Sequence, residues 1–593
     1  MRPRQLIIEL RRRKVFRSAA VYIVAAWVAV QVADQFFPAI GVPEEAIRHV
    51  WLIVALLFPL AVVFSWRYDV SLDGVSRTPP ANPGDDFEAS LRRADILLLA
   101  ALAAVAVSVL LQFGSRIEPG QGRLSDSISP FSIAVLPFDD LSGNPDEQFF
   151  VSGMQSSLID GLSRIRNLRV TSKVSTLPFR QAGGSLLDIA SQLSVARVVE
   201  GTVLRNRDRV SIALRMHDAE KDEQVWSARF EDELENIMVL QAKAAQEIAN
   251  QVRVQLGQEE REQFAAARPV NPDAYLAVLK GIFHVERYNP EDMRIAATHF
   301  QRAVEIDPEY ALGHWGLGKL CGFQAQAGML TPEQAHAQCL PLNLRALELD
   351  PFLPEAYMGL AATSTWQLFE WEEARKYFER AIELNPSYAE AHMFYSHYLG
   401  IVGELDKSTE HIERAVELDP LNPFTIGLYS IQLLMRDDLA QAIEVAKKAL
   451  SMAPGYAFGY RSLVVAHDTL GNEDEAIAAQ ASQLRLVIDA PEAADFLEEV
   501  YTNDNYESAN LQLAQELVRQ SEAVHIRPMI IATSFEQGGD YESALDWFET
   551  AFEQRDPDAP YIGVLIKDPV IRSHPRYKAL LEKMGLDYWA ANP

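Results

Sequence analysis

Apolar residues follow two patterns along the 593-residue chain: long uninterrupted runs near its start, and regularly spaced positions in the remainder. The runs cover residues 18–40, 50–66 and 96–113. Each has about the 17–25 residues that a helix needs to cross the hydrocarbon core of a bilayer. The first run is longer than the apolar part of a signal peptide, and further runs follow it. The pattern therefore predicts three transmembrane helices within residues 18–113.

The distribution of Lys and Arg predicts which side of the membrane each segment faces. Seven of these residues precede the first run and four lie in the loop 67–95, whereas the loop 41–49 has one. Because cytoplasmic segments carry the excess of basic residues, we predict a basic cytoplasmic tail at 1–17 and a short cytoplasmic loop at 67–95. Residues 114–130 form a predicted linker. The predicted location is the bacterial inner membrane, with residues 114–593 in the periplasm.

Strand and helix patterns alternate from residue 131 onward. The apolar run from Phe131 to Phe138 has the length of a buried strand. Further along, apolar residues at every second position indicate a half-buried strand; they are Val210, Ile212, Leu214 and Met216. A helical pattern ends near residue 256. Together these patterns predict a small α/β domain over residues 131–258.

Similar phrases recur through the second half of the chain at a fixed spacing. Four prolines that follow Asp, Asn or Ala are separated by 35, 34 and 34 residues: Pro351, Pro386, Pro420 and Pro454. This period is typical of tetratricopeptide repeats, in which each repeat is a pair of antiparallel helices. Small residues keep the same phase and allow the two helices to approach closely: Ala374, Ser408, Ala442 and Ala476. We predict tetratricopeptide repeats over residues 271–560 and a C-terminal cap over 561–593.

A resemblance to a known family adds to this interpretation. The α/β domain resembles the TolB-amino-terminal-like (FlgO/CsgG-related) domain of bacterial envelope proteins in the segments IAVLPFDDLSGNPDEQFFVSGMQSSLIDGLSRIRNLRV and VVEGTVLRNRDRVSIALRMHDAEKDEQVWSARFE. The stretch ELRRRKVFRSAAVYIVAAWVAVQVAD looks like the membrane lead-in of a group of such proteins that end in tetratricopeptide repeats. The resemblance implies an envelope interaction module without catalytic residues. Some relatives carry an N-terminal cyclase or winged-helix domain, which this sequence is expected to lack.

The first helix of each repeat lines the concave inner surface of a repeat superhelix. Met and aromatic side chains on such a surface adapt to bound segments and anchor them. The alternative is that several of these side chains pack against neighbouring repeats. From the phase of the repeats we predict that a groove binds a protein or peptide partner through Trp315, Lys319, Met358, Met393, His397, Phe424, Ile431, Leu434 and Arg461.

The chain has two cysteines, Cys321 and Cys339. Cys321 falls in the first helix of a predicted repeat, and Cys339 takes the small-residue position of the second helix. The two side chains can therefore face each other across one helix pair. In an oxidising periplasm we predict a disulfide between them. Two buried free thiols are the alternative.

Charge and motifs narrow the function. The net charge is −28, although residues 1–123 carry 14 Lys and Arg against 11 Asp and Glu. The remainder is therefore strongly acidic and repels phosphate backbones, so we expect no nucleic-acid partner. The sequence has no HExxH, no GxSxG and no complete phosphate-binding loop. We predict no catalytic residues, no bound metal and no cofactor.

The predicted fold class is membrane helices plus a small α/β domain plus an all-α tetratricopeptide-repeat superhelix. We predict that the chain is not an enzyme but an inner-membrane-anchored periplasmic scaffold, which binds protein or peptide partners of the envelope through its repeat groove and α/β module. The alternative is a transmembrane signalling receptor subunit that passes a periplasmic signal to a separate cytoplasmic protein.

Overall fold

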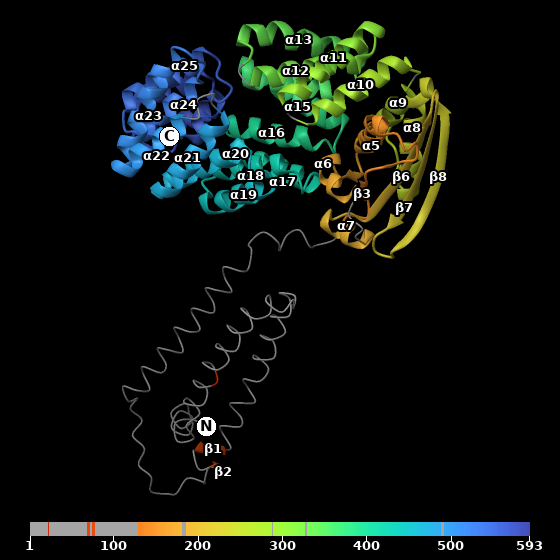
Figure 1. Cartoon of the computed structure of the whole chain (residues 1–593), viewed down its shortest axis with the longest axis horizontal. Coiled ribbons are helices and arrows are strands. Elements are labelled where there is room, and N and C mark those ends of the chain that lie inside the picture. Colours follow the sequence, from red (N-terminus) through yellow and green to blue (C-terminus); the bar gives the residue numbers. More distant parts are fainter. Residues whose placement is uncertain are drawn as a thin grey trace. The chain divides into compact units, whose positions relative to one another are not determined.

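The computed structural model describes short segments near the start of the chain and most of the remainder. The described residues are Tyr22, 68–71, 74–77, 128–180, 185–267, 269–287, 289–326, 329–487 and 492–592. They belong to two compact units, Met1–Ser127 and Ile128–Pro593. In the first unit, strands β1 (Tyr68–Ser71) and β2 (Gly74–Arg77) pair antiparallel (Figure 1).

The membrane part of the predicted fold class is corrected by the structure. None of the helices that the structure describes is long and apolar enough to cross a bilayer. The described fold is mostly helical, with a small mixed sheet and a helical-repeat superhelix. Apart from Tyr22, β1 and β2, the segments predicted for this region lie outside the described residues: the tail 1–17, the spans 18–40, 50–66 and 96–113, the loop 67–95 and the linker up to residue 127.

A mixed sheet begins the second unit. Its strands are β3 (Ser132–Val135), β4 (Asp139–Asp140), β5 (Arg169–Val170), β6 (Arg197–Asn206), β7 (Arg209–Asp218) and β8 (Glu223–Glu233). They follow the order β5-β3-β6-β7-β8, with β4 paired to β6. β3 runs parallel to β5 and β6, whereas β6, β7 and β8 pair antiparallel. The alternation predicted along β7 is confirmed, because its four apolar side chains are at most 4% exposed.

Helices cover both faces of this sheet. Helices α5 (Gln148–Ser163) and α8 (Ile237–Val252) enclose the larger apolar core, and α7 (Leu186–Gln192) covers a smaller one on the other face. We call residues 128–256 the α/β module. Gly153 of α5 allows close contact with α10 (Pro272–Val285), since a Cβ there would lie 2.7 Å from the Leu279 side chain. The module is thus packed directly on the first repeat helix.

Helices after the module form eight consecutive pairs in the described part of the chain, and each pair contacts the next. Figure 1 shows them following one another from α10 in green to α25 in blue. The short helix α9 (Gln258–Ala265) precedes them, and α14 continues into a π-helical turn, Ser364–Leu368. The remaining helices are α11 (Pro290–Ile306), α12 (Ala311–Gln326), α13 (Pro332–Leu349), α14 (Pro354–Thr363), α15 (Trp371–Leu384), α16 (Ala389–Ile401), α17 (Leu405–Leu418), α18 (Pro423–Met435), α19 (Leu439–Met452), α20 (Ala457–Thr469), α21 (Glu473–Val487), α22 (Glu492–Asn503), α23 (Tyr506–Ser521), α24 (Pro528–Gln537) and α25 (Tyr541–Glu553).

Small residues explain why these helices pair at a regular spacing. The four predicted small positions, from Ala374 to Ala476, are completely buried. Helices α13, α15, α17 and α19 each end two residues before one of the recurring prolines, where the missing N–H of proline disfavours a further turn. The prediction of tetratricopeptide repeats in the C-terminal region is confirmed.

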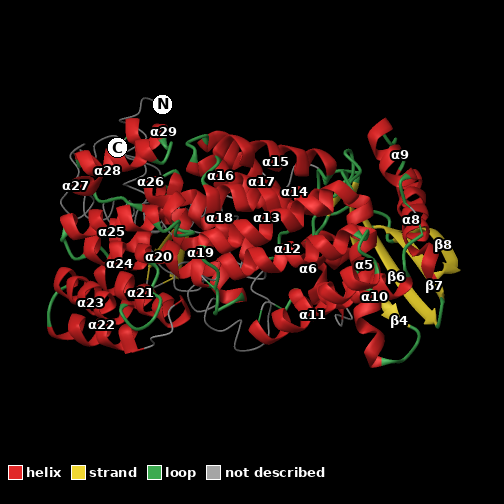
Figure 2. Ribbon diagram, turned by 90° about the horizontal axis from the view of Figure 1, so that it is seen from above, coloured by secondary structure: helices red, strands yellow, loops and turns green. Residues whose placement is uncertain are grey.

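The chain after α25 returns over the repeats. We call residues 554–592 the C-terminal segment; it contains α26 (Ile562–Leu565), α27 (Pro569–Ser573), α28 (Pro575–Lys583) and α29 (Asp587–Ala591). Helix α26 contacts both α16 and α18, and Figure 2 shows it beside them. The Trp589 indole donates a hydrogen bond of 2.9 Å to the carbonyl oxygen of Ile401. The segment therefore does more than cover the last repeat pair.

Candidate partner-binding surface

The residues predicted to line the groove lie on the first helices of five repeat pairs, α12, α14, α16, α18 and α20. Six of their side chains are at most 9% exposed: Trp315, Met358, Met393, His397, Ile431 and Leu434. Phe424 is half-buried among other aromatic rings, and Lys319 and Arg461 form ion pairs with Glu390 and Asp558. Other parts of this chain cover most of these side chains. That they bind a partner stays a prediction.

His397 shows what covers the middle of the inner face. Its Nδ1 lies 2.9 Å from the Tyr561 hydroxyl oxygen, and its Nε2 lies 3.0 Å from the carbonyl oxygen of Leu428. Burial lowers the pKa of His397 to about 4, so the imidazole is neutral at pH 7. Nε2 then donates to the carbonyl and Nδ1 accepts from Tyr561, which itself accepts from the Trp366 indole. His397 thus holds the C-terminal segment.

Two further contacts fix the C-terminal segment on the repeats. The Trp371 indole donates to the carbonyl oxygen of Met584 at 2.8 Å. Lys567 Nζ donates to the carbonyl oxygen of Leu434 at 2.8 Å and forms an ion pair of 2.6 Å with Asp437. Burial lowers the pKa of Lys567, and Asp437 opposes this shift. These contacts occupy polar groups that an incoming partner would otherwise meet.

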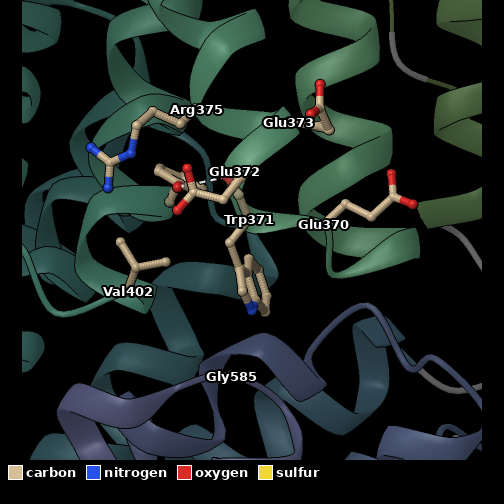
Figure 3. Close-up of a pocket in the computed structure, with 8 residues that line it drawn as sticks. Glu370, Trp371, Glu372, Glu373, Arg375, Val402 and Gly585 are labelled. Atoms are coloured by element: carbon tan, nitrogen blue, oxygen red, sulfur yellow. Dashed lines mark hydrogen bonds between the residues drawn. The ribbon is translucent and has the colours of Figure 1, made fainter.

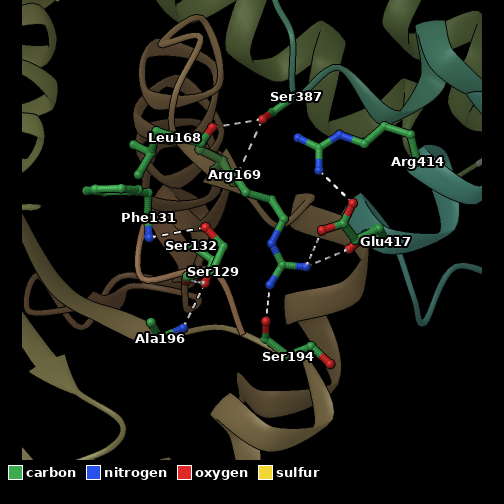
Figure 4. A network of polar contacts seen from close by, with 11 residues as sticks. Ser129, Phe131, Ser132, Leu168, Arg169, Ser194, Ala196, Ser387, Arg414 and Glu417 are labelled. Atoms are coloured by element: carbon green, nitrogen blue, oxygen red, sulfur yellow. Dashed lines mark hydrogen bonds and ion pairs between the residues drawn. The ribbon is translucent and has the colours of Figure 1, made fainter. Parts of the chain in front are cut away.

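The α/β module is attached to the turns between successive repeats. The Ser387 hydroxyl donates to the carbonyl oxygen of Leu168 at 3.0 Å, as Figure 4 shows. In the next turn, the Asp419 carboxylate accepts hydrogen bonds from the Ser172 and Ser175 hydroxyls, the latter at 2.6 Å. Burial raises the pKa of Asp419, and these hydrogen bonds oppose the shift. The module therefore has one fixed position on the repeats.

Arg169 of β5 reinforces this attachment with a buried charge. Its side chain is 8% exposed, and its Nη1 lies 3.2 Å from the Glu417 carboxylate (Figure 4). The other end of the guanidinium donates to the carbonyl oxygen of Ser194. Burial lowers the pKa of Arg169, and Glu417 opposes the shift. Because an unpaired buried charge is costly, loss of Glu417 would destabilise this interface.

A cluster of mixed charge lies where α5 faces the first repeats. Arg164 Nη2 lies 4.0 Å from the Glu355 carboxylate on α14, and Asp160 is one helical turn away on α5. Burial raises the pKa of Glu355, and the charge of Arg164 opposes this shift. Glu355 therefore keeps its proton to a higher pH than an exposed glutamate does.

An open hollow of about 380 Å³ lies between the start of α15 and the turn at Gly585. Figure 3 shows the Trp371 ring directed toward Gly585, with Glu370 and Glu373 directed away from it. The acidic side chains lie at or next to the first turn of α15, where the helix dipole favours negative charge. Their position is therefore explained by helix stability, without a ligand.

A second cavity, of about 80 Å³, opens between α20, α21, α24 and residues 565–567. Its wall combines apolar side chains with Gln480 and with charged residues of both signs: Asp468, Glu536, Asp558, Arg461 and Lys567. Thr469, which also lines the cavity, is exposed. We call this cavity the acidic cleft. Sequence reasoning named Arg461 but missed the other polar residues of this wall, although Glu536 is the one charged residue of the helix PMIIATSFEQ and is a usable signal. Among the residues that the structure describes, no group of three His, Cys, Asp or Glu is placed to hold a metal ion.

Cys321 and Cys339 form a disulfide that joins α12 to α13. Both cysteines are at most 5% exposed, in a small apolar cluster with Ala325 and Ala335. The bond links the two helices of a single repeat pair. The phase of the repeats predicts this arrangement, because it places the two cysteines on facing sides of the pair.

Two family models match parts of the chain. Residues 129–247 match the HilA/YgeH-like transcriptional regulator, second domain, and residues 360–423 match the tetratricopeptide repeat. The first match overlaps the predicted TolB-amino-terminal-like domain but bears a different description. Together with the helix pairing, the second match defines the C-terminal region as a tetratricopeptide-repeat scaffold, a fold typical of protein–protein interaction.

A curated protein named putative adenylate cyclase 3, from Rhizobium meliloti (strain 1021), is 30% identical over 237 residues. The match covers 40% of this chain and 40% of that relative, so the chain spans less than half the relative's length.

Solved structures with similar folds include PilW, described as a widely conserved type IV pilus biogenesis factor, at 16% identity and a TM-score of 0.30 over 36% of this chain and 94% of that one. A monomeric mutant of IFIT1 with Gppp-AAAA has 12% identity and a TM-score of 0.36 over 54% and 89% of the two chains. A thermophilic tetratricopeptide-repeat protein of Thermus thermophilus has 19% identity and a TM-score of 0.27 over 36% and 99%.

Proposed function

We propose that this chain is a scaffold that binds a protein partner in the acidic cleft, with the α/β module and the repeats acting as one body. The observation that carries the proposal is the position of the cleft on the first helices α20 and α24, the kind of surface that repeat superhelices use for binding. Most of the predicted groove residues on α14, α16 and α18 are buried by the chain itself. The partner therefore approaches the cleft.

The α/β module adds to this scaffold through its fixed position. Its resemblance to envelope interaction modules supports a role in partner binding, beside the repeats. Because Arg169, Ser172 and Ser175 attach it to the turn around Asp419, a partner that touches both parts meets a surface that needs no ordering on binding. Such preorganisation favours affinity, since less conformational entropy is lost.

We further propose that residues 128–593 work in an oxidising compartment, the periplasm in a bacterium with two membranes. The disulfide between Cys321 and Cys339 supports this location, because disulfides persist in such compartments and are rare in the cytosol. Acid-quenched cells treated with a thiol-reactive polyethylene glycol test it. A chain that shifts in mass only after reduction supports the location; a chain modified without reduction contradicts it.

Photo-crosslinking tests partner binding. A benzoylphenylalanine in place of Gln483, which lines the cleft, is compared with the same group in place of Glu553, an exposed residue at the end of α25. We expect irradiation of cells to give one discrete adduct from position 483 and none of the same mass from position 553. Absence of an adduct at 483, or the same adducts at both positions, would remove the cleft as the partner site.

A signalling subunit is the second candidate. The match of residues 129–247 to a domain of a transcriptional regulator, and the similarity to a protein named putative adenylate cyclase, favour a role in regulation. In this version the partner is a separate output protein. This role is supported if a cyclase or a regulator co-purifies with the chain and is lost when the crosslinking site at Gln483 is blocked. A crosslinked partner that has neither cyclase nor regulatory activity contradicts it.

A further inference from the structure

Two carboxylates of the acidic cleft lie close together, Asp468 and Glu536, and Asp568 is a further acidic neighbour of Glu536. Glu536 is 8% exposed. Burial, followed by repulsion from Asp468 and Asp568, raises the pKa of Glu536 well above its usual range, and the Asp568 amide opposes the shift. The Tyr506 and Tyr541 hydroxyls donate to Asp468 and Asp568, at 2.7 and 3.2 Å. These neutral donors bring no positive charge to the site.

Two basic residues also line the cleft, and both already form ion pairs. Arg461 pairs with Asp558, another residue of the cleft wall, and Lys567 pairs with Asp437. In the part of the chain that the structure describes, no Lys or Arg forms an ion pair with Glu536 or its two acidic neighbours. Glu536 and Asp468 therefore have no basic partner among the described residues.

Gln480 provides an independent observation on the same wall. Its side chain is 5% exposed, and its Nε2 donates to Asn510 and Gln537 at 2.9 and 3.0 Å. Its Oε1 is buried and accepts no hydrogen bond from any described residue. A buried acceptor without a donor is costly, and most native proteins avoid it. Gln480 Oε1, on the wall of the cleft, thus lacks a hydrogen-bond donor.

We propose that the acidic cleft receives the side chain of a lysine from the partner protein, whose ammonium group meets Glu536 and Asp468 while its methylenes contact the apolar wall. This inference deepens the proposed function and rests on it. An ammonium supplies three donors and one positive charge, whereas Glu536 and Asp468 have no basic partner and Gln480 Oε1 has no donor among the described residues. The wall includes Val464, Val465 and Ile530, which suit the lysine stem.

Size and charge agree with this occupant. A cavity of about 80 Å³ holds a few non-hydrogen atoms, since a single water needs roughly 10–15 Å³ measured in the same way. This space suits the compact ammonium and its last methylenes. The net charge of −28 attracts basic partners and increases their association rate.

Two peptides that differ in one group test the proposal on the full chain. Acetyl-leucyl-lysyl-leucinamide carries the ammonium, and its norleucine analogue lacks it but keeps the stem. We expect an NMR titration to show at least about tenfold tighter binding of the lysine peptide, the usual effect of one hydrogen bond to a charged group. Glu536→Gln should abolish the preference, whereas the exposed control Glu553→Gln should keep it.

Equal binding of the two peptides, or a preference that survives Glu536→Gln, would overturn the lysine site. Because a variant can alter folding, a second readout uses Thr469→Cys beside the cleft: the lysine peptide should slow its maleimide modification at least about fivefold more than the norleucine peptide. The two proposals fail separately. If position 483 crosslinks a partner but the peptides bind equally, the scaffold proposal stands and the lysine site is rejected. If the lysine peptide is preferred but no partner is crosslinked, the lysine site stands and the scaffold proposal is rejected.

Discussion

Replacing Asp419 by alanine tests whether the α/β module is attached to the repeats as described. Asp419 is 4% exposed and accepts hydrogen bonds from Ser172, Ser175 and the Asn422 amide. Ser175 is completely buried, so its hydroxyl would lose its acceptor away from water. One unsatisfied buried donor costs about 1–3 kcal/mol, and each half-exposed donor costs about 0.5–1.5 kcal/mol.

The substitution also removes a carboxylate whose burial is unfavourable, which offsets part of this loss. The net cost is then about 3 kcal/mol, which increases the equilibrium constant for detachment of the module from the repeats on the order of a hundredfold. Hydrogen exchange followed by mass spectrometry should therefore show much faster exchange in β5 and α6 (Lys173–Thr176) of Asp419→Ala. The matched control is Asp307→Ala. Asp307 occupies the same turn in an earlier repeat and accepts from the Glu309 amide, and none of the side-chain hydrogen bonds that the structure describes joins it to the module. Unchanged exchange in β5 and α6 of Asp419→Ala would refute the attachment.

The remaining predictions concern the cleft, the disulfide and the C-terminal segment. Because the folded-state pKa of Glu536 is raised, its ionisation destabilises the folded chain as pH rises above the unfolded pKa of about 4.3. Glu536→Gln should therefore raise the melting temperature at pH 7–8, and this gain should vanish near pH 4. A gain that does not depend on pH would contradict the raised pKa. The disulfide joins two cysteines separated by 18 residues, so reducing it should lower the free energy of unfolding measured in urea by about 3 kcal/mol. An unchanged free energy would show that the bond does not constrain the unfolded chain. Tyr561→Phe should lower the free energy of unfolding by about 1–2 kcal/mol, because the His397 imidazole and the Trp366 indole lose the hydroxyl that they contact. The exposed control Tyr588→Phe should leave the free energy of unfolding unchanged. Equal effects of the two substitutions would contradict the buried contact.

Local patterns predicted the repeats and the sheet well. The 34-residue period and the buried small positions depend on neighbouring helices, whose contacts are close in sequence. The alternation along β7 follows from the geometry of a single strand with one buried face. Such features can be derived without knowing the tertiary arrangement.

The inner face could not be predicted in the same way. His397 meets Tyr561, a residue 164 positions later, and Ser387 meets Leu168, 219 positions earlier. Contacts at such separations leave no periodic signal, so residues with the phase of a groove, such as Met393 and Ile431, are found buried. Of the acidic cleft, the sequence predicted Arg461 alone, because residues of α20, α21 and α24 that lie far apart in the sequence form one site.

Thiol accessibility tests most directly the central claim that the chain covers the predicted groove and leaves the cleft open. Thr469→Cys and Ile431→Cys are each prepared in the full chain, and the parent chain, whose two cysteines are bonded, serves as the blank. We predict that maleimide modifies Thr469→Cys rapidly, and Ile431→Cys only after denaturant is added. Equal rates in the native chain would contradict the account.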